Sequence, residues 1–345
     1  MGHPQRTAIL SLAEAIDRLQ SVDALEAFSP LTGDPVLVVD LRDGPGQTAP
    51  AALATARARL AQLACPSVAI RAASQTPEAA EAALVDRFDV VVDSEEEAAP
   101  ILETVARAPL AAMALVQLLR QSAGLDLHEG LIAESFVYAA LQGGREFASW
   151  LGARPRAQRR EPSPGPAVLA RRSDGRLDLT LNRPERRNAF SAEMRDALVE
   201  TLAIALSDPS ITEIVLRGTG PAFCSGGDLD EFGTLPDPAT GHAVRSTRNA
   251  ARCLAACAER TRAEVHGACV GAGIELPAFA RRVVATRDAY FQLPEVAMGL
   301  VPGAGGTVSI PRRVGRQRAA YLALAGIRLD APTALRWGLV DEIAG

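Results

Sequence analysis

Short apolar segments alternate with segments of helical periodicity along most of this 345-residue chain. In the C-terminal half, "LDLTL" (177–181) alternates as a half-buried strand does, "SAEMRDALVETLAIAL" has apolar residues at helical spacing, and "ITEIVLRG" is typical of a buried strand that ends at a glycine. Ser191 is a natural N-cap for the helix between them. Because strands joined through a helix run parallel, this order predicts an α/β fold with a parallel sheet.

The N-terminal half shows the same alternation, with expected strands at 35–41, 66–70 and 88–93 separated by Ala-rich helices. A helix that runs into a short strand occurs in both halves, at 60–70 and at 254–265. Residues 34–94 are therefore either a degenerate copy of part of the C-terminal half or an unrelated module. Nothing in them matches the glutamates and glycine turns described below, so we expect this unit to be non-catalytic.

A proline- and arginine-rich stretch separates the two halves. Residues 153–166 contain four prolines and four arginines and have no apolar period, which is typical of a linker. The expected organisation is an N-terminal helix and lead-in (1–33), a small α/β unit (34–94), a helical segment (95–152), a linker (153–167) and a C-terminal core (168–345).

Composition narrows the class of protein. A hydrophobic content of 48% is ample for packed cores, and a net charge of -5 argues against a dedicated nucleic-acid or membrane surface. The run "ILETVARAPLAAMALVQLL" is interrupted by Glu103, Arg107 and Pro109, so it is not a clean membrane span. The five cysteines form no paired framework and the N-terminus lacks a secretion signal, which favours a cytoplasmic protein. Cys253 and Cys257 have no partners at metal-binding spacing, and we expect no metal.

Two glutamates follow unusual backbone signals in "ACVGAGIELPAFARRVVATRDAYFQLPE" (268–295). Glu275 lies just past the turn formed by Gly271, Ala272 and Gly273, and Glu295 comes directly after a proline. A helix that begins at this turn has unpaired N–H groups that favour a negative oxygen. A second turn, in "PAFCSGGDLDEF" (221–232), also leaves its backbone accessible. Two such turns indicate an oxyanion hole for an acyl carbonyl. Alternatively, either turn can be purely structural, and Glu275 can serve only as a partner of the helix dipole.

Other chemistries receive less support from the sequence. Ser225 stands in "FCSGG", which lacks the first glycine of a hydrolase nucleophile elbow, and neither His242 nor His266 has an evident orienting acid. The stretch "GACVGAG" does not match the G-x-G-x-x-G pattern of a dinucleotide site. We expect His266 to be structural rather than a proton-transfer group.

From about residue 168 to the end, the chain resembles the crotonase family, also called the enoyl-CoA hydratase/isomerase superfamily. The resemblance rests on "LTLNRPERRNAFSAEM", "GPAFCSGGDLDEF", "VHGACVGAGIEL", "AYFQLPEVAMGLVPGAGGT" and "ALRWGLVDEI", which occur in the family's order. It implies an α/β fold, a crotonase-like β-β-α superhelix core, which here follows an N-terminal α/β and helical unit. It also implies an acyl-CoA or enoyl-CoA thioester as partner, with coenzyme A as part of the substrate and no separate cofactor, no nucleic acid or membrane, and a homo-oligomer, either a trimer or a dimer of trimers.

The resemblance assigns roles to residues of this chain. It implies catalysis by Glu275, which activates water, and Glu295, which transfers the α-carbon proton. The backbone N–H groups of Gly227 and Ala272 would form the oxyanion hole, and Gly303 would help to position the water. Substrate binding is further implied for a turn and a strand end, namely Cys224, Ser225, Gly226 and Gly271.

The order of segments departs from the family's pattern. The sequence ends at "GLVDEIAG", where family members continue into C-terminal helices, and Ala280 and Arg281 replace the family's usual Cys-Asp pair. Residues 84–152 resemble those C-terminal helices, including the closing "QGGREFASWL". We therefore expect residues 95–152 to pack against the core in place of that tail, unless the likeness reflects only the general character of amphipathic helices.

The expected function is that of an enoyl-CoA hydratase, which adds water across a double bond conjugated to a thioester by two-glutamate acid–base catalysis. Isomerisation or another crotonase-type reaction is the first alternative. A non-catalytic acyl-CoA-binding scaffold subunit is the second.

Overall fold

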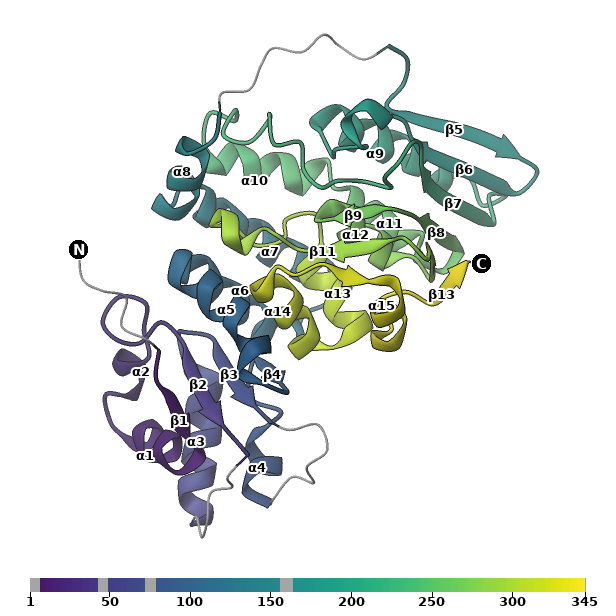
Figure 1. Cartoon of the computed structure of the whole chain (residues 1–345). Helices are drawn as coiled ribbons and strands as arrows, with labels where there is room; N and C mark the ends of the chain where they lie inside the picture. The colour runs from purple at the N-terminus through teal and green to yellow at the C-terminus, as the bar shows by residue number, and fades with distance from the viewer. Residues whose placement is uncertain (1–6, 43–48, 72–78, 156–163, 345) are drawn as a thin grey trace.

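The computed structural model describes residues 7–42, 49–71, 79–155 and 164–344. The chain forms an N-terminal sheet unit (residues 7–94), a helical segment (95–152) and a C-terminal unit (164–344), with the helical segment lying between the other two (Figure 1). Most of the predicted linker falls at 156–163, outside the described residues.

Four parallel strands in the order β1-β2-β3-β4 form the sheet of the N-terminal unit. Its elements are β1 (Ile9–Ser11), α1 (Leu12–Gln20), α2 (Ala24–Ala27), β2 (Leu37–Asp40), α3 (Pro50–Gln62), β3 (Ser67–Ile70), α4 (Ala79–Leu84) and β4 (Val90–Val92). The strand β1 was not predicted, because three residues that lead directly into a helix are too short to show an alternating pattern. Along β2, Leu37 and Val39 pack toward α1 and α3, whereas Val38 faces a second core.

The helical segment contains four helices, as the absence of strand signals predicted. They are α5 (Glu95–Arg107), α6 (Pro109–Ser122), α7 (Leu127–Gln142) and α8 (Arg145–Gly152). Asp126 caps α7 and forms a capping box with Glu129, so this helix has a well-defined start. No single helix of the described residues is long and apolar enough to cross a bilayer; only α5 and α6 taken together, which meet at 114°, pass that test of length and composition.

The C-terminal unit contains a six-stranded sheet in the order β13-β10-β8-β7-β6-β5 and a three-stranded sheet in the order β12-β11-β9. The strands are β5 (Val168–Ser173), β6 (Arg176–Leu181), β7 (Glu213–Gly218), β8 (Thr261–Val265), β9 (Ala268–Val270), β10 (Arg282–Thr286), β11 (Tyr290–Gln292), β12 (Leu329–Asp330) and β13 (Glu342–Ala344). The helices are α9 (Ala192–Ser207), α10 (Pro238–Thr247), α11 (Ala250–Ala256), α12 (Ala272–Glu275), α13 (Gly306–Val314), α14 (Arg316–Ala325) and α15 (Ala331–Trp337).

The strand order of this unit is that of a β-β-α superhelix. Successive strands enter the two sheets in turn, β8 and then β9, β10 and then β11. The predicted parallel pairing of β6 with β7 is confirmed, with Leu177 opposite Ile214, and Ser191 caps α9 as expected. The antiparallel edge strand β5 was not predicted.

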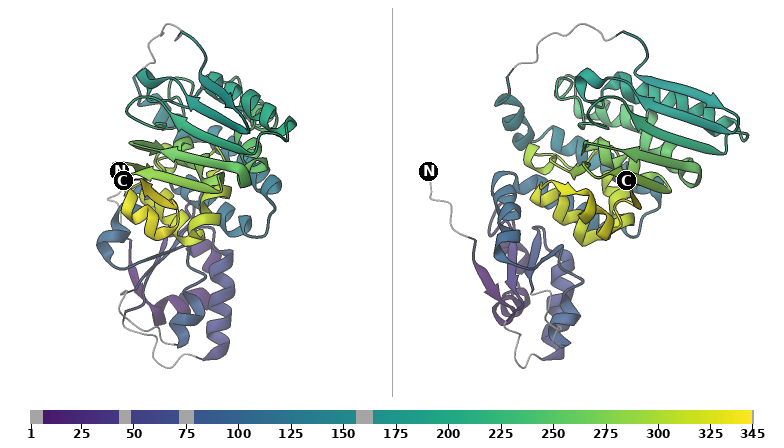
Figure 2. Two further views of the ribbon diagram at one scale, coloured as in Figure 1. Left: turned by 90° about the vertical axis from the view of Figure 1, so that its right-hand side faces the viewer. Right: turned by 45° about the vertical axis from the view of Figure 1, so that its right-hand side comes forward.

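One hydrophobic core joins the three parts of the chain. It includes Val68 and Val90 of the N-terminal sheet, Leu115 of α6, and Val308 and Ile310 of α13. Helix α14 packs against α5, α6 and β4, and α7 packs against α10 and α13, so the helical segment lies against the C-terminal unit in both views of Figure 2.

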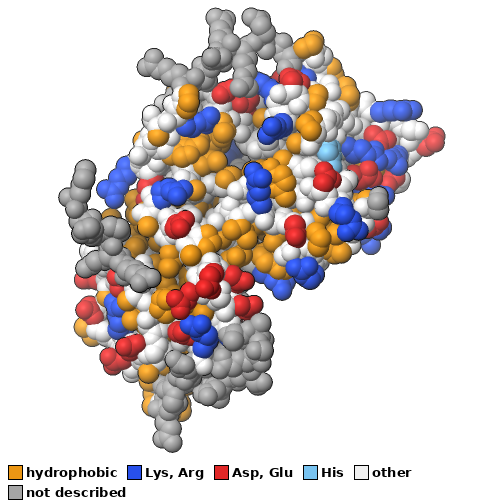
Figure 3. Space-filling model, in the orientation of Figure 1, with side chains coloured by type: hydrophobic (Ala, Val, Ile, Leu, Met, Phe, Trp, Pro, Cys, Tyr) orange, Lys and Arg blue, Asp and Glu red, His pale blue; other side chains and the backbone are white. Residues whose placement is uncertain are grey.

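A buried ionic cluster reinforces the same junction. Asp89, which is 1% exposed, accepts hydrogen bonds from Arg120 Nε of α6 at 2.8 Å and from Arg316 Nη1 of α14 at 3.0 Å. A buried carboxylate that is shared by two guanidinium groups is strongly coupled to both, so Asp89 connects the N-terminal sheet to α6 and α14. On the face shown in Figure 3, hydrophobic side chains extend across the middle of the molecule between charged side chains of both signs.

Candidate active site

A cavity of about 590 Å³ lies where the C-terminal unit meets α7 and α8. Its lining includes Gly227, Ala272, Glu275, Glu295 and Gly303, so it brings together five of the residues predicted from sequence. A concave, mainly apolar cavity with a few converging polar groups is the usual form of a small-molecule site.

Glu275 occupies the last position of the short helix α12 and is 2% exposed. Its Oε2 accepts hydrogen bonds from the backbone N–H groups of Ala304 at 2.8 Å and Gly306 at 2.9 Å. A Cβ atom on residue 306 would lie 2.6 Å from Glu275 Cγ, so a larger residue there would displace the Glu275 side chain. These contacts hold the carboxyl group in one orientation at the wall of the cavity.

Glu295 follows β11 and precedes a short 3-10 turn, Val296–Met298. Its Oε2 is buried and has no hydrogen-bond partner among the described residues. Its Oε1 and that of Glu275 both border the glycine turn, since a Cβ atom on Gly271 would lie 2.5 Å from Glu295 Oε1 and 3.7 Å from Glu275 Oε1. The two carboxyl groups therefore converge, which the twenty-residue gap in sequence could not reveal.

Unpaired backbone donors lie beside the two carboxyl groups. Within the described residues, the N–H groups of Gly227, Ala272 and Gly303 donate no hydrogen bond to another residue. Ala272 is the first residue of α12, where an N–H group has no partner within the helix. All three residues line the cavity, so these donors are accessible to a ligand.

The other predicted substrate-binding residues lie outside the lining of the cavity. Cys224, Ser225, Gly226 and Gly271 form the turns that carry Gly227 and Ala272, with positive φ angles of 95° at Gly226 and 49° at Gly271. Cys224 is buried, and the Ser225 N–H group donates to the carbonyl of Arg187. Their contribution to the site is the backbone conformation, which glycine adopts readily at positive φ.

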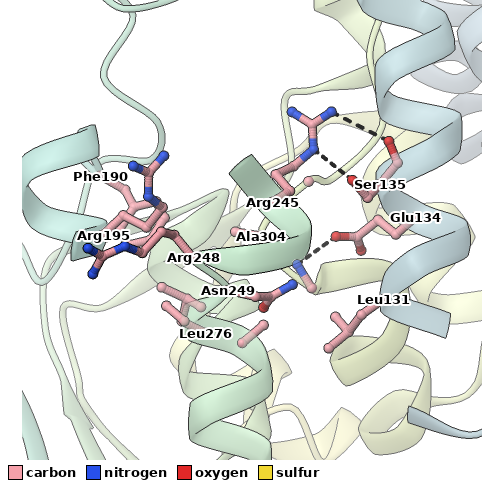
Figure 4. A pocket seen from close by; sticks show the side chains of 14 residues that line it. Leu131, Glu134, Ser135, Phe190, Arg195, Arg245, Arg248, Asn249, Leu276 and Ala304 are labelled. Atoms are coloured by element: carbon pink, nitrogen blue, oxygen red, sulfur yellow. Dashed lines mark hydrogen bonds between the residues drawn. The ribbon is translucent and has the colours of Figure 1, made fainter. Parts of the chain in front are cut away.

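A third glutamate, which is buried beside the other two, was missed by sequence reasoning. Glu134 of α7 is 3% exposed and accepts a hydrogen bond from the Gly305 N–H group at 2.7 Å (Figure 4). It also accepts one from the Thr307 N–H group at 2.9 Å. Successive N–H groups of residues 304–307 therefore point alternately to Glu275 and Glu134. A single carboxylate in the apolar stretch "GLIAESFVY" was the available signal, but nothing in the sequence identified its partner.

Tyr138, one turn after Glu134 on the same helix, was also missed. It lines the cavity, and a Cβ atom on Gly303 would lie 2.4 Å from its ring. Helix α8 completes this side of the cavity through Phe147, whose ring centroid lies 6.3 Å from that of Phe232. The helical segment thus contributes one wall of the site.

Burial shifts the protonation of all three glutamates. It raises the pKa of Glu295 to about 8 and that of Glu134 to about 7. Burial and the nearby carboxyl groups of Glu295 and Glu134 raise the pKa of Glu275 well above its ordinary value, although its two backbone donors act in the opposite direction. Carboxyl groups this close titrate together, so the cluster retains protons near neutral pH.

This protonation predicts a pH-dependent effect of Glu295→Gln on stability. Native Glu295 keeps its proton to about pH 8, whereas the unfolded chain loses it near an ordinary pKa of about 4.3. Between these values the native state binds more protons, so the free energy of unfolding falls as pH rises. The glutamine variant lacks this loss, and its stability relative to the unmodified protein should increase between pH 5 and pH 8 by on the order of a few kcal/mol.

Urea unfolding at several pH values measures this difference. Glu259→Gln removes an exposed carboxyl group and serves as the control. A stability difference for Glu295→Gln that stays constant from pH 5 to pH 8 would show that Glu295 ionises normally in the folded protein.

The two-sheet superhelix and its cavity place this chain in the crotonase fold class. This chain belongs to the enoyl-CoA hydratase/isomerase family, whose sequence model matches residues 171–345. The family and the crotonase fold inferred from sequence are thereby confirmed.

Relatives with different reactions show similar levels of identity. The chain is 38% identical to the 1,2-epoxyphenylacetyl-CoA isomerase of Escherichia coli over 51% of this chain and 69% of that protein. It is 37% identical to the 2,3-dehydroadipyl-CoA hydratase of Escherichia coli over 51% and 68%, and 35% identical to the mevalonyl-coenzyme A hydratase of Aspergillus fumigatus over 48% and 62%. The solved structure of an enoyl-CoA hydratase/isomerase from Mycobacterium paratuberculosis is 30% identical to this chain. The match covers 52% of this chain and 73% of that protein, with a TM-score of 0.49.

Proposed function

We propose that this protein is an enoyl-CoA hydratase. The observation that carries the proposal is the convergence of the Glu275 and Glu295 carboxyl groups at Gly271, beside the unpaired N–H groups of Gly227 and Ala272. Hydration of a double bond conjugated to a thioester requires a base for water, an acid for the α-carbon and donors for the enolate oxygen. The cavity contains a group suited to each task.

In the proposed reaction, Glu275 removes a proton from water as the water oxygen bonds to the β-carbon. The electron pair of the double bond moves onto the thioester oxygen, which accepts hydrogen bonds from Gly227 and Ala272. Protonated Glu295 then gives its proton to the α-carbon as the carbonyl re-forms. One water molecule is added, and transfer of a proton from Glu275 to Glu295 restores the starting state.

The hydrogen bonds around the two carboxyl groups support this division of roles. Glu275 Oε2 accepts from two N–H groups, which favours its ionised form, whereas Glu295 Oε2 has no donor among the described residues. Burial raises the pKa of both carboxyl groups, and we assign the shared proton to Glu295 because Glu275 Oε2, unlike Glu295 Oε2, has backbone donors to stabilise its charge. Gly303, whose N–H group is unpaired, is our candidate for holding the water. The reaction requires no cofactor beyond the coenzyme A of its substrate, and the homo-oligomeric state stays a prediction.

An isomerase is the second candidate function, because one relative is named as an isomerase and proton transfer between two carbons requires only one of the two glutamates. A non-catalytic acyl-CoA-binding scaffold is the third. Incubation with a panel of enoyl-CoA thioesters separates the three. Hydration removes the conjugated thioester absorbance and adds the mass of water, isomerisation changes the absorbance at constant mass, and a scaffold binds without turnover.

Ala272 tests the proposed oxyanion hole separately from the glutamates. Ala272→Gly keeps the N–H group and should be tolerated. Ala272→Pro removes the donor, and proline is acceptable at the first position of a helix, so the variant should fold yet lose about 3 kcal/mol or more of transition-state stabilisation. Steady-state kcat and circular dichroism check both expectations. A folded proline variant with normal turnover would disprove the assignment of Ala272 as a donor.

A further inference from the structure

Arg245 of α10 lines the active-site cavity and also a smaller cavity beyond it. The two cavities share Gly303 and Ala304, which lie beside Glu275, as well as Phe190, Arg195 and Arg245. The Gly227 and Ala272 donors line only the larger cavity. The acyl chain of a thioester whose carbonyl lies at these donors, and which extends past Glu275, would therefore reach Arg245 where the two cavities meet.

The guanidinium group of Arg245 is held by neutral groups. Its Nε donates to Ser135 Oγ at 3.0 Å and its Nη2 donates to the Ser135 carbonyl at 3.4 Å (Figure 4). Its Nη1 donates to Gln142 Oε1 at 3.2 Å. Its Cζ lies 4.6 Å from the centre of the Tyr138 ring. Among the described residues, no carboxylate oxygen lies within 4 Å of it, in contrast to Arg195, which pairs with Asp196, and Arg248, which pairs with Glu200.

The nearby carboxyl groups do not neutralise Arg245 directly. Glu134 is engaged with the N–H groups of Gly305 and Thr307 and acts on Arg245 only through space. Burial lowers the pKa of Arg245, which reflects the cost of holding its charge in this place. A half-buried guanidinium group without a paired anion gains strongly from a ligand that supplies one.

We propose that the acyl group of the substrate ends in a carboxylate and that this carboxylate pairs with Arg245. The proposal deepens the proposed function, since it rests on an acyl-CoA thioester bound at Gly227 and Ala272. Arginine offers a planar pair of donors that matches a carboxylate. Tyr138 and Phe190 line the larger cavity together with Arg245, so they would pack around the methylene groups that precede the charged end.

Binding of saturated acyl-CoA thioesters tests the proposal without turnover. Calorimetry would compare thioesters with four, six and eight acyl carbons that end either in a carboxylate or in the isosteric amide. For at least one chain length, the carboxylate should bind roughly ten-fold or more tightly than its amide, as expected for a charge-assisted contact. Equal affinities at every length would overturn the proposal. Hydration is measured separately with unsaturated substrates, so failure of the proposed reaction is distinguishable from failure of this inference.

Variants of Arg245 test whether its guanidinium group binds the carboxylate. Arg245→Gln should reduce the carboxylate-to-amide ratio to about one while affinity for the amide is kept, and Arg245→Lys should retain part of the ratio. Arg252→Met is the control, because Arg252 of α11 donates to a backbone carbonyl and lines neither cavity. This variant should keep the full ratio. An unchanged ratio in Arg245→Gln overturns the proposal. An equal loss of affinity for both ligands also overturns it, because that result indicates contact with a coenzyme A phosphate or a structural role in holding α7.

Discussion

Glu275→Gln and Glu295→Gln are each expected to lower kcat by roughly 10²–10⁴ while leaving the fold intact, because an amide keeps the shape of the side chain but cannot transfer the proton. In Glu275→Gln, the amide oxygen can still accept the N–H groups of Ala304 and Gly306, so the loop stays in place. Glu295→Gln breaks no hydrogen bond of Glu295 Oε2, which has no partner among the described residues.

Steady-state hydration with an enoyl-CoA substrate measures these losses, and thermal unfolding shows that the variants are folded. Glu259→Gln, an exposed glutamate that pairs with Arg281, is the matched control and should retain full activity. Near-normal turnover in either active-site variant would be incompatible with the two-glutamate mechanism. Loss of hydration with retained isomerisation in only one variant would instead favour the isomerase.

The C-terminal unit alone, residues 165–345, is expected to be insoluble or inactive. The full chain covers α13 with α7 so closely that a Cβ atom on Gly130 would lie 3.0 Å from Val308 Cγ2. Without α7, this apolar surface is exposed, which promotes aggregation. The loop at 304–307 also loses the Glu134 contacts that order it beside Glu275.

Expression of residues 1–155 as a separate chain should restore part of the activity, because the contacts between the two pieces are non-covalent. The same segment with Glu134→Ala should restore less than the unmodified segment, and this comparison separates the role of Glu134 from general coverage of the surface. A soluble and fully active C-terminal unit would show that the helical segment is an independent module, and its interpretation as the family's displaced C-terminal tail would then be wrong.

Local sequence signals were sufficient for much of the fold. The alternation in β6, the helical spacing of α9 and its Ser191 cap are encoded within a few residues of each other, so each was predictable from a short window. The short strand β1 was missed because its stability depends on pairing with β2, which begins twenty-six residues after β1 ends.

The sequence by itself determined the family, the α/β class and the positions of Glu275 and Glu295 behind their glycine and proline turns, because all of these depend on residue type and near neighbours. Only the tertiary structure added Tyr138 and Arg245 to the cavity that the five predicted residues share, and placed Glu134 beside it. The contact between Glu134 and Gly305 spans 171 residues, and Arg245 meets Ser135 across 110. Such contacts form when packing brings α7 against α10 and α13, and the burial that accompanies this packing is also what raises the pKa values of the three glutamates.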